Sequence, residues 1–169
     1  MTGSVEETRW LNDDERALWM RMQAIAEFVP AAVDAQLRAS AGLTRYDYYV
    51  LAMLSESRSH SRPMSDLAMV TNGSLSRLSH AAAKLEQSGL ITRAPIVGDR
   101  RATLATLTEA GWNKVVATAP GHVAEVRKIV FDNLTAEQVT ALNEALAPVI
   151  RGLGLPGGAL GSGDGSACA

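Results

Sequence analysis

The chain has 169 residues, of which 47% are hydrophobic, 5% are aromatic and 20% are charged. This length is most simply one domain, and the abundance of Ala and Leu favours helices over a β-sandwich or barrel. No apolar run reaches the roughly 18 residues of a membrane span, and the polar, acidic N-terminus lacks the pattern of a secretory signal. The only cysteine, Cys168, excludes a disulfide framework, so we expect a cytoplasmic protein.

The net charge of −2 is distributed unevenly along the chain. Residues 1–57 carry 5 basic and 9 acidic side chains, residues 58–103 carry 7 and 3, and residues 104–169 carry 4 and 6. A basic middle between acidic flanks indicates that one segment meets a polyanion while the flanks do other work. Chance clustering of solvated charge is the alternative on this observation alone.

Two helices are expected in the N-terminal third of the chain. Residues 11–40 place apolar side chains at three- and four-residue steps, after a cap at Asn12 or at the next residue. Residues 43–57 begin with Thr44 as the N-cap and Asp47 in the third helical position, which is an acidic variant of the capping box. Both segments therefore predict helices with one apolar face.

The next segment predicts a helix-turn-helix motif. A short helix over 65–71, capped by Ser65, precedes a tight turn at 72–74 and a longer helix over 75–89. Gly73 is available for a positive φ in the turn. Two helices joined by a short glycine-containing turn are typical of this motif, in which the second helix lies in the major groove of DNA.

The remaining elements complete a mainly α fold with a small β-hairpin wing. Two strand-like runs, 90–96 and 102–107, predict the hairpin. Long helices are expected over 109–131 and 136–151. The tail, 153–169, is rich in Gly and Ser and has no periodicity, so we expect it to be disordered.

The helix over 75–89 has one apolar and one polar face. At roughly 100° per residue, the side expected to pack inward holds Leu75, Leu78, Ala82 and Leu85. The opposite side and the capping residue give the candidate DNA-binding residues Ser74, Ser76, Arg77, His80 and Lys84. Arg77 can pair bidentately with guanine, whereas Lys84 more plausibly meets phosphate. Ser76 and His80 are short polar readers, and backbone N–H groups at Ser74 suit a phosphate. An ordinary solvated helix face is the alternative for this helix taken alone.

The hairpin carries two adjacent arginines at its expected tip, within "PIVGDRRATL" (95–104). A hairpin tip is narrow enough to enter a minor groove, where the guanidinium groups of Arg100 and Arg101 meet a strongly negative potential. Asp99 is a poor DNA contact, and we expect it to hold an arginine in one rotamer. A surface Asp–Arg pair of little consequence is the alternative.

The segment from "LTRYDYYVLAMLSES" through "LTEAG" resembles the multiple antibiotic resistance regulator (MarR) family of bacterial transcription factors. The most specific pieces are "SRLSHAAAKLEQSGLI", the "DRR" that ends at Arg101, and the "LTEAG" that opens the next helix. The resemblance covers roughly residues 10–152.

The resemblance implies a single winged helix-turn-helix domain whose DNA-binding lobe spans about 43–107. The helices that it assigns to dimerisation span about 11–40, 109–131 and 136–151. It implies two recognition helices on a palindromic operator of double-stranded DNA, with Arg101 in the minor groove and Asp99 supporting it. The residues support a homodimer independently, because the C-terminal helix and its approach leave six apolar side chains that need a covering surface. These are Leu134, Val139, Leu142, Leu146, Val149 and Ile150.

The resemblance also raises the question of an effector, since members of the family often bind a small aromatic or phenolic ligand. Other members use a cysteine or zinc, but here the cysteine lies in the tail and the three histidines lack ligand spacing. We therefore expect no metal and no cofactor. A pocket between the first two helices would be lined by Arg16, Trp19, Met22, Tyr46, Tyr49 and Met53. Arg16 would meet an anion there, and ordinary core packing of these residues is the alternative.

Together these features predict a dimeric, sequence-specific DNA-binding transcriptional regulator, a repressor that a small-molecule effector releases. The alternative is a winged-helix module for protein–protein contacts, which the same fold permits. Such a module would more often expose an apolar patch where this chain has polar and basic residues. No nucleophile–base pattern, phosphate-binding glycine loop or metal cluster is present in the sequence, so we expect no enzyme.

Overall fold

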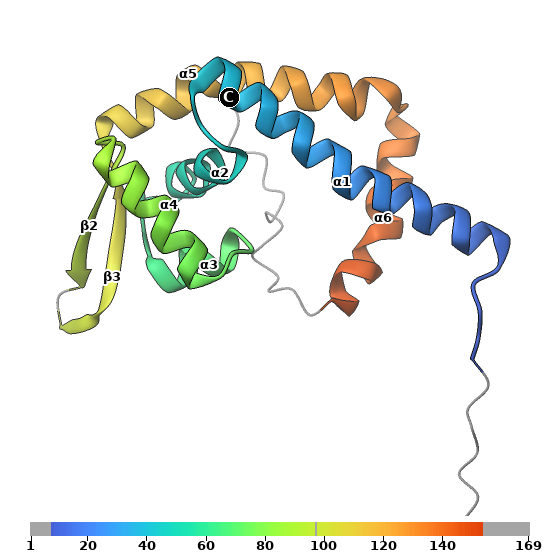
Figure 1. Ribbon diagram of the computed structural model, residues 1–169, viewed down its shortest axis with the longest axis horizontal. Coiled ribbons are helices and arrows are strands. Elements are labelled where there is room, and N and C mark those ends of the chain that lie inside the picture. Colours follow the sequence, from blue (N-terminus) through green and yellow to red (C-terminus); the bar gives the residue numbers. More distant parts are fainter. Residues whose placement is uncertain (1–7, 97, 154–169) are drawn as a thin grey trace, which may run out of the picture.

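The computed structural model describes residues 8–96 and 98–153, except for the side chains of Arg100 and Arg101. In chain order, the elements are α1 (Asp13–Ala41), α2 (Arg45–Ser55), β1 (Ser61–Pro63), α3 (Met64–Val70), α4 (Leu75–Gln87), β2 (Ile91–Ile96), β3 (Asp99–Leu107), α5 (Glu109–Ile129), a 3-10 turn (Phe131–Asn133) and α6 (Ala136–Gly152). Figure 1 confirms the expected mainly helical fold with a small β wing. The expected disordered tail lies outside the described residues except for Leu153.

Side-chain caps fix where most of the helices begin. The backbone N–H of Asp47 donates to Thr44 Oγ1 and that of Thr44 donates to Asp47 Oδ2, both over 3.0 Å, so the expected capping box is present. The Ser74 hydroxyl accepts a backbone N–H from the first turn of α4 at 3.2 Å. One expected cap is wrong: α3 begins at Met64 without a side-chain cap, and Ser65 lies inside the helix.

The turn between α3 and α4 uses its residues differently from the prediction. Asn72, and not Gly73, takes the positive φ, at 48°. A short polar side chain tolerates this left-handed conformation. Gly73 is required for a close approach instead, because a Cβ at this position would lie 2.1 Å from the Tyr46 hydroxyl. The expectation for Gly73 is therefore corrected: it makes room for α2.

The sheet has three antiparallel strands in the order β1-β3-β2. Ala105 at its centre is opposite Arg62 on β1 and Arg93 on β2. The sequence analysis predicted the β2–β3 hairpin but no strand at β1. This strand has only three residues and ends in Pro63, which can occupy a sheet edge because it has no N–H to donate.

The hairpin is longer than the sequence indicated. Its turn contains Gly98, whose φ of +90° is accessible to glycine without strain. From there β3 begins at Asp99, three residues earlier than the run 102–107 predicted. The backbones of Arg100 and Arg101 therefore lie in the first residues of β3, next to the turn.

The hydrophobic core lies in a lobe made by α2, α3, α4, the sheet, the C-terminal part of α1 and the start of α5. Its largest fully buried side chains are Leu37, Leu51, Leu54, Leu67, Leu78, Leu85, Ile91 and Val50. One expected core residue is misplaced: Leu75 is 58% exposed, because the first turn of α4 borders an open groove. We refer to this compact unit as the lobe.

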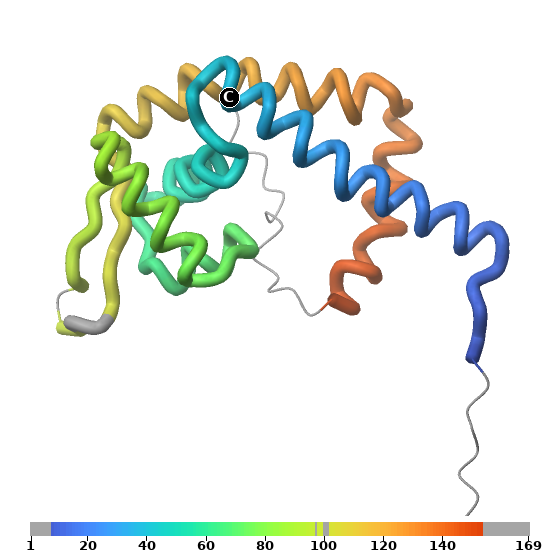
Figure 2. The backbone as a smooth tube through the Cα atoms, in the orientation of Figure 1, coloured from blue at the N-terminus to red at the C-terminus, as the bar shows by residue number. Residues whose placement is uncertain are grey.

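The N-terminal half of α1 and all of α6 lie outside this lobe (Figures 1 and 2). The 29-residue α1 buries only Val33 and Leu37, and α6 buries no residue. Large apolar side chains on these two helices remain exposed, namely Leu18, Trp19, Met20, Ile25, Phe28, Leu142, Leu146 and Val149. Apolar faces of this extent indicate a covering surface beyond this single chain. Among the described helices, none is long and apolar enough to cross a membrane.

Candidate nucleic-acid interface

The outward face of α4 carries the polar residues that the sequence singled out. Ser76, Arg77, His80 and Lys84 are exposed. On the opposite side of the helix, Leu78, Ala82 and Leu85 are buried, as expected from the helical periodicity. The helix therefore presents hydroxyl, imidazole and cationic groups to the outside while its apolar side chains fix it to the lobe.

Arg77 is supported from below by an aromatic ring. Its guanidinium carbon lies 4.1 Å from the centroid of the Tyr46 ring on α2. The ring is buried, with 8% of the residue exposed, and its hydroxyl lies 3.0 Å from Thr71 Oγ1 at the end of α3. The face of an aromatic ring attracts a cation, so α2 influences where Arg77 lies on the surface of α4.

Lys84 makes a second contact between α4 and α2. Its Nζ lies 2.7 Å from Oδ2 of Asp47, whose side chain is 4% exposed, against 54% for that of Lys84. The same carboxylate caps α2 at Thr44, so Asp47 joins two helices. An ammonium group has three N–H donors, and this pair leaves two of them for the phosphate contact proposed from the sequence. Lys84 thus has a structural role that the sequence did not reveal.

An ion pair attaches the wing to α4. Arg93 on β2 donates from Nη2 and Nε to Glu86 Oε2 at 2.7 and 3.1 Å, and its backbone N–H donates to Oε1 at 2.9 Å. These hydrogen bonds lower the pKa of Glu86 below its usual value. Glu86 and Arg93 therefore hold the base of the hairpin at a fixed position relative to α4. The sequence analysis did not single out Arg93.

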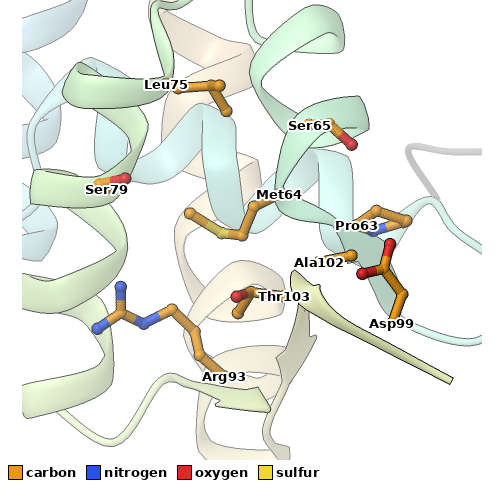
Figure 3. A pocket seen from close by; sticks show the side chains of 9 residues that line it. All are labelled: Pro63, Met64, Ser65, Leu75, Ser79, Arg93, Asp99, Ala102 and Thr103. Carbon is orange, nitrogen blue, oxygen red and sulfur yellow. The ribbon is translucent and has the colours of Figure 1, made fainter. Parts of the chain in front are cut away.

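An open groove of about 360 Å³ separates α4 from the hairpin (Figure 3). Its lining combines apolar side chains with hydroxyls and two charged groups, namely Pro63, Met64, Ser65, Leu75, Ser79, Arg93, Asp99, Ala102 and Thr103. In Figure 3, Leu75 and Ser79 border it from α4, while Arg93 and Thr103 border it from the strands. The groove lies between the two elements that the sequence assigned to DNA.

The hairpin and α4 project from the same side of the lobe, below α5 in Figure 1. Asp99 is exposed near the hairpin turn and borders the groove. The side chains of Arg100 and Arg101 lie outside the described part of the chain. Their backbones lie in β3 beside the turn, and their contact with DNA stays a prediction.

The six candidate effector residues fall into two separate groups. On α2, Tyr46 lies under Arg77, and Tyr49 donates its hydroxyl to the carbonyl of Val70 at 3.1 Å. Burial raises the pKa of Tyr49. Met53 packs against the core of the lobe. These three side chains are accounted for by contacts within the lobe, which agrees with the alternative of ordinary packing.

The other three candidates lie on the part of α1 that leaves the lobe. Arg16 and Trp19 are exposed and Met22 is half-buried. In Figure 1 the first turns of α1 lie at the opposite end of the molecule from α2. A single chain therefore does not bring the two groups together. Within residues 8–96 and 98–153, no group of three or more His, Cys, Asp or Glu residues could hold a metal ion.

Comparison with known proteins places this geometry in a family. The family model for MarR matches residues 43–103. AbsC, a MarR family transcriptional regulator from Streptomyces coelicolor, is 39% identical, with a TM-score of 0.81 over 86% of this chain and 98% of AbsC. Sco3205 from the same organism, a MarR family regulator solved in complex with DNA, is 38% identical, with a TM-score of 0.81 over 85% of this chain and 94% of Sco3205.

A third structure from Streptomyces coelicolor, the MarR family regulator Sco5413, is 24% identical and shares the fold with a TM-score of 0.72 over 85% of this chain and 97% of its own. A comparison with curated proteins gives no match. The likeness to AbsC and Sco3205 extends over nearly their whole length. The chain therefore belongs to the MarR family of transcriptional regulators.

Proposed function

We propose that the protein is a homodimeric, sequence-specific DNA-binding regulator that represses transcription and is released from DNA by a small molecule. The observation that carries the proposal is the exposed polar and basic face of α4 beside a hairpin that projects in the same direction. The likeness to Sco3205, which was solved in complex with DNA, supports it. The family consists of transcription regulators and not of enzymes, and we place the protein in the cytoplasm.

In this proposal α4 lies in the major groove of double-stranded DNA. Arg77 pairs with a guanine, while Ser76 and His80 contact neighbouring base edges. Lys84 and the backbone N–H groups at Ser74 hold phosphates on either side. The hydroxyls of Ser79 and Thr103 border the groove beside α4, where they can donate to the sugar–phosphate backbone.

The wing supplies the second contact in this arrangement. Arg100 and Arg101 lie in the narrow minor groove next to the major groove that α4 occupies, with Arg101 as the main contact. Asp99 limits the rotamers of an arginine and keeps its own charge away from phosphate. Because Glu86 and Arg93 fix the hairpin to α4, the two contacts form together.

The dimer follows from the apolar faces of α1 and α6. A second copy is the covering surface that these faces require, and a two-fold dimer presents two copies of α4. Their half-sites are expected about one helical turn apart, ~34 Å, so the operator is a palindrome. A DNase footprint without two-fold symmetry would contradict this geometry.

Selection of bound fragments from random DNA tests the proposal directly. The full chain is incubated with random duplexes, and the enriched sequence is expected to be a palindrome. Arg77→Ala is expected to weaken binding by about 1–3 kcal/mol and to relax the preference at one base position in each half-site. Gln87→Ala, an exposed substitution on the same helix, is the control and is expected to keep the preference. Equal enrichment of all sequences by the wild-type chain would overturn the proposal.

Release by an effector has a test of its own. The enriched duplex is titrated with a panel of aromatic and phenolic acids, and we expect at least one compound to dissociate the complex and to raise the melting temperature of the free protein. If no compound of this class has either effect, the effector part of the proposal is wrong, while the DNA-binding part is unaffected.

A further inference from the structure

The ring of Tyr46 is held in one orientation by two neighbouring residues, Thr71 and Gly73. Its hydroxyl lies 3.0 Å from Thr71 Oγ1, which itself lies 2.7 Å from the carbonyl oxygen of Leu67. A threonine hydroxyl has one hydrogen, and since Thr71 donates it to Leu67, Tyr46 must donate to Thr71. The backbone of Gly73 lies against the hydroxyl so closely that a Cβ there would be 2.1 Å from it. The ring is therefore fixed by α3 and by the turn that precedes α4.

This fixed ring supports Arg77 without using its hydrogen-bond donors. The guanidinium carbon lies 4.1 Å from the ring centroid, and among the described residues no hydrogen bond or ion pair occupies the N–H groups of this guanidinium. Arg93 shows the contrast, because its Nε and Nη2 are both occupied by Glu86. A carboxylate under Arg77 would occupy the N–H fork that guanine needs and would add negative charge beside DNA. An aromatic face restrains the cation and leaves the fork available.

We infer that Tyr46 is a positioning residue for base recognition by Arg77, an inference that rests on the proposed DNA-binding function. An arginine side chain loses much conformational freedom when it binds a base, and part of that loss is already incurred in a chain whose Arg77 lies on the ring. Removal of the ring should therefore weaken discrimination at the base that Arg77 reads by about two- to tenfold. Phosphate contacts and affinity for random DNA should not change, since Tyr46 lies beneath Arg77 and is buried.

The experiment uses a duplex that the wild-type chain enriches from random DNA, together with all single-base variants of that duplex. Relative affinities are measured for the wild type, Tyr46→Leu, Arg77→Ala and the double variant. Tyr46→Leu should lose discrimination at the same base position as Arg77→Ala, to a smaller extent. In the Arg77→Ala background, Tyr46→Leu should have no further effect at that position, because no guanidinium remains to be positioned.

Tyr48 provides a matched control on the same helix. It is 7% exposed, against 8% for Tyr46. Its ring packs on His122 of α5, with ring centroids 4.8 Å apart. Tyr48→Leu should lower the melting temperature as Tyr46→Leu does but leave base discrimination intact. Tyr46→Phe keeps the aromatic face and should discriminate better than Tyr46→Leu. If the leucine variant melts below the assay temperature, Tyr46→Met replaces it because the unbranched, flexible methionine side chain adapts better to the space that the ring leaves.

Three outcomes would overturn this inference, and only the last of them would also overturn the proposed function. If the wild type discriminates between bases and Tyr46→Leu discriminates as well as Tyr48→Leu does, the positioning role is wrong and the proposed function stands. The positioning role is also wrong if Tyr46→Leu weakens all duplexes equally in both Arg77 backgrounds. If the wild type enriches no sequence, the proposed function fails, and the inference fails with it.

Discussion

The lobe buries its large apolar side chains, whereas the outlying helices leave theirs exposed. The outlying helices are α6 and the N-terminal half of α1. In the lobe, leucines such as Leu51 and Leu78 are fully buried within one chain. On the outlying helices, Phe28 is 71% exposed and Leu142 is 44% exposed. The comparison teaches that the lobe obtains its shape from its own core, whereas the outlying helices leave the apolar faces that the proposed second copy would cover. Substitutions in the two regions should therefore differ in which property they change.

The largest effect is expected in the lobe core, where one helix offers a matched pair of leucines. Leu78→Ala removes a fully buried side chain and should lower the free energy of unfolding by about 2–5 kcal/mol. Leu75→Ala, at a position that is 58% exposed, should change it by less than about 0.5 kcal/mol. Urea denaturation at one fixed protein concentration measures both. Similar losses for the two variants would show that the lobe is not packed as described.

A charge on α6 should affect association instead of the lobe. Leu142→Glu places a carboxylate in the apolar face that a second copy is proposed to cover, and it should weaken dimerisation by about 3 kcal/mol. Asn143→Glu adds the same charge at the next residue and serves as the control. Sedimentation velocity at micromolar concentration should show a monomer for the first variant and a dimer for the second. A dimer of unchanged stability in Leu142→Glu would place the interface elsewhere.

A smaller effect is expected where α2 holds the C-terminal part of α4. Lys84→Met leaves the Asp47 carboxylate buried without its ammonium partner and should cost about 1–3 kcal/mol of stability, less than for a fully buried pair because Lys84 is half exposed. In an Asp47→Asn background the same substitution should cost much less. Lys128→Met breaks a pair with Glu125 in which the lysine is 73% exposed, and it should cost less than about 0.5 kcal/mol. Urea denaturation measures the cost of Lys84→Met in the wild-type and Asp47→Asn backgrounds. Equal costs in both would show that the Lys84–Asp47 pair does not contribute to stability.

The smallest effect is expected at His122 of α5, which packs against Tyr48 of α2. Burial lowers the pKa of His122 below its ordinary value of 6.5. The unfolded chain therefore takes up a proton at a higher pH than the folded chain, so stability should fall as the pH drops below about 6.5 and be restored above it. The loss should stay under about 1 kcal/mol because the ring is partly solvated. Unfolding free energies between pH 7.5 and about 5.5 should be flatter for His122→Gln, and identical slopes for the two proteins would assign the pH dependence to other groups.

Local sequence signals were sufficient for the starts of α2 and α4 and for the presence of the wing. The Thr44–Asp47 capping box and the Ser74 cap each act over a few residues, and the structure has both where the pattern predicted. The β2–β3 hairpin is also present, although β3 begins three residues earlier than the pattern indicated. The edge strand β1 was missed because three residues ending in Pro63 contain no alternation to recognise. Leu75 has the right periodicity for the core, but periodicity cannot show that the neighbouring surface is an open groove.

The contacts that organise the candidate site cross long stretches of chain, and no local pattern encodes them. Asp47 and Lys84 are separated by 37 residues, and each side chain taken alone resembles an ordinary surface charge. Tyr46 was assigned to an effector pocket because an aromatic residue near the first helix suits one. Its place under Arg77 depends on how α2 and α4 cross, which only the packed lobe determines.

The ion pair between Glu86 and Arg93 has a consequence for which DNA the proposed regulator would accept. The ion pair sets the distance between the hairpin and α4 before DNA binds. The two elements therefore fit a duplex only where its neighbouring major and minor grooves are separated by a matching distance. A duplex whose adjacent grooves are too wide or too narrow must bend to fit. Stiff sequences would therefore bind more weakly, even where they differ only at bases that no side chain touches. Loss of the ion pair would thus broaden the range of tolerated DNA sequences without changing any residue that contacts a base.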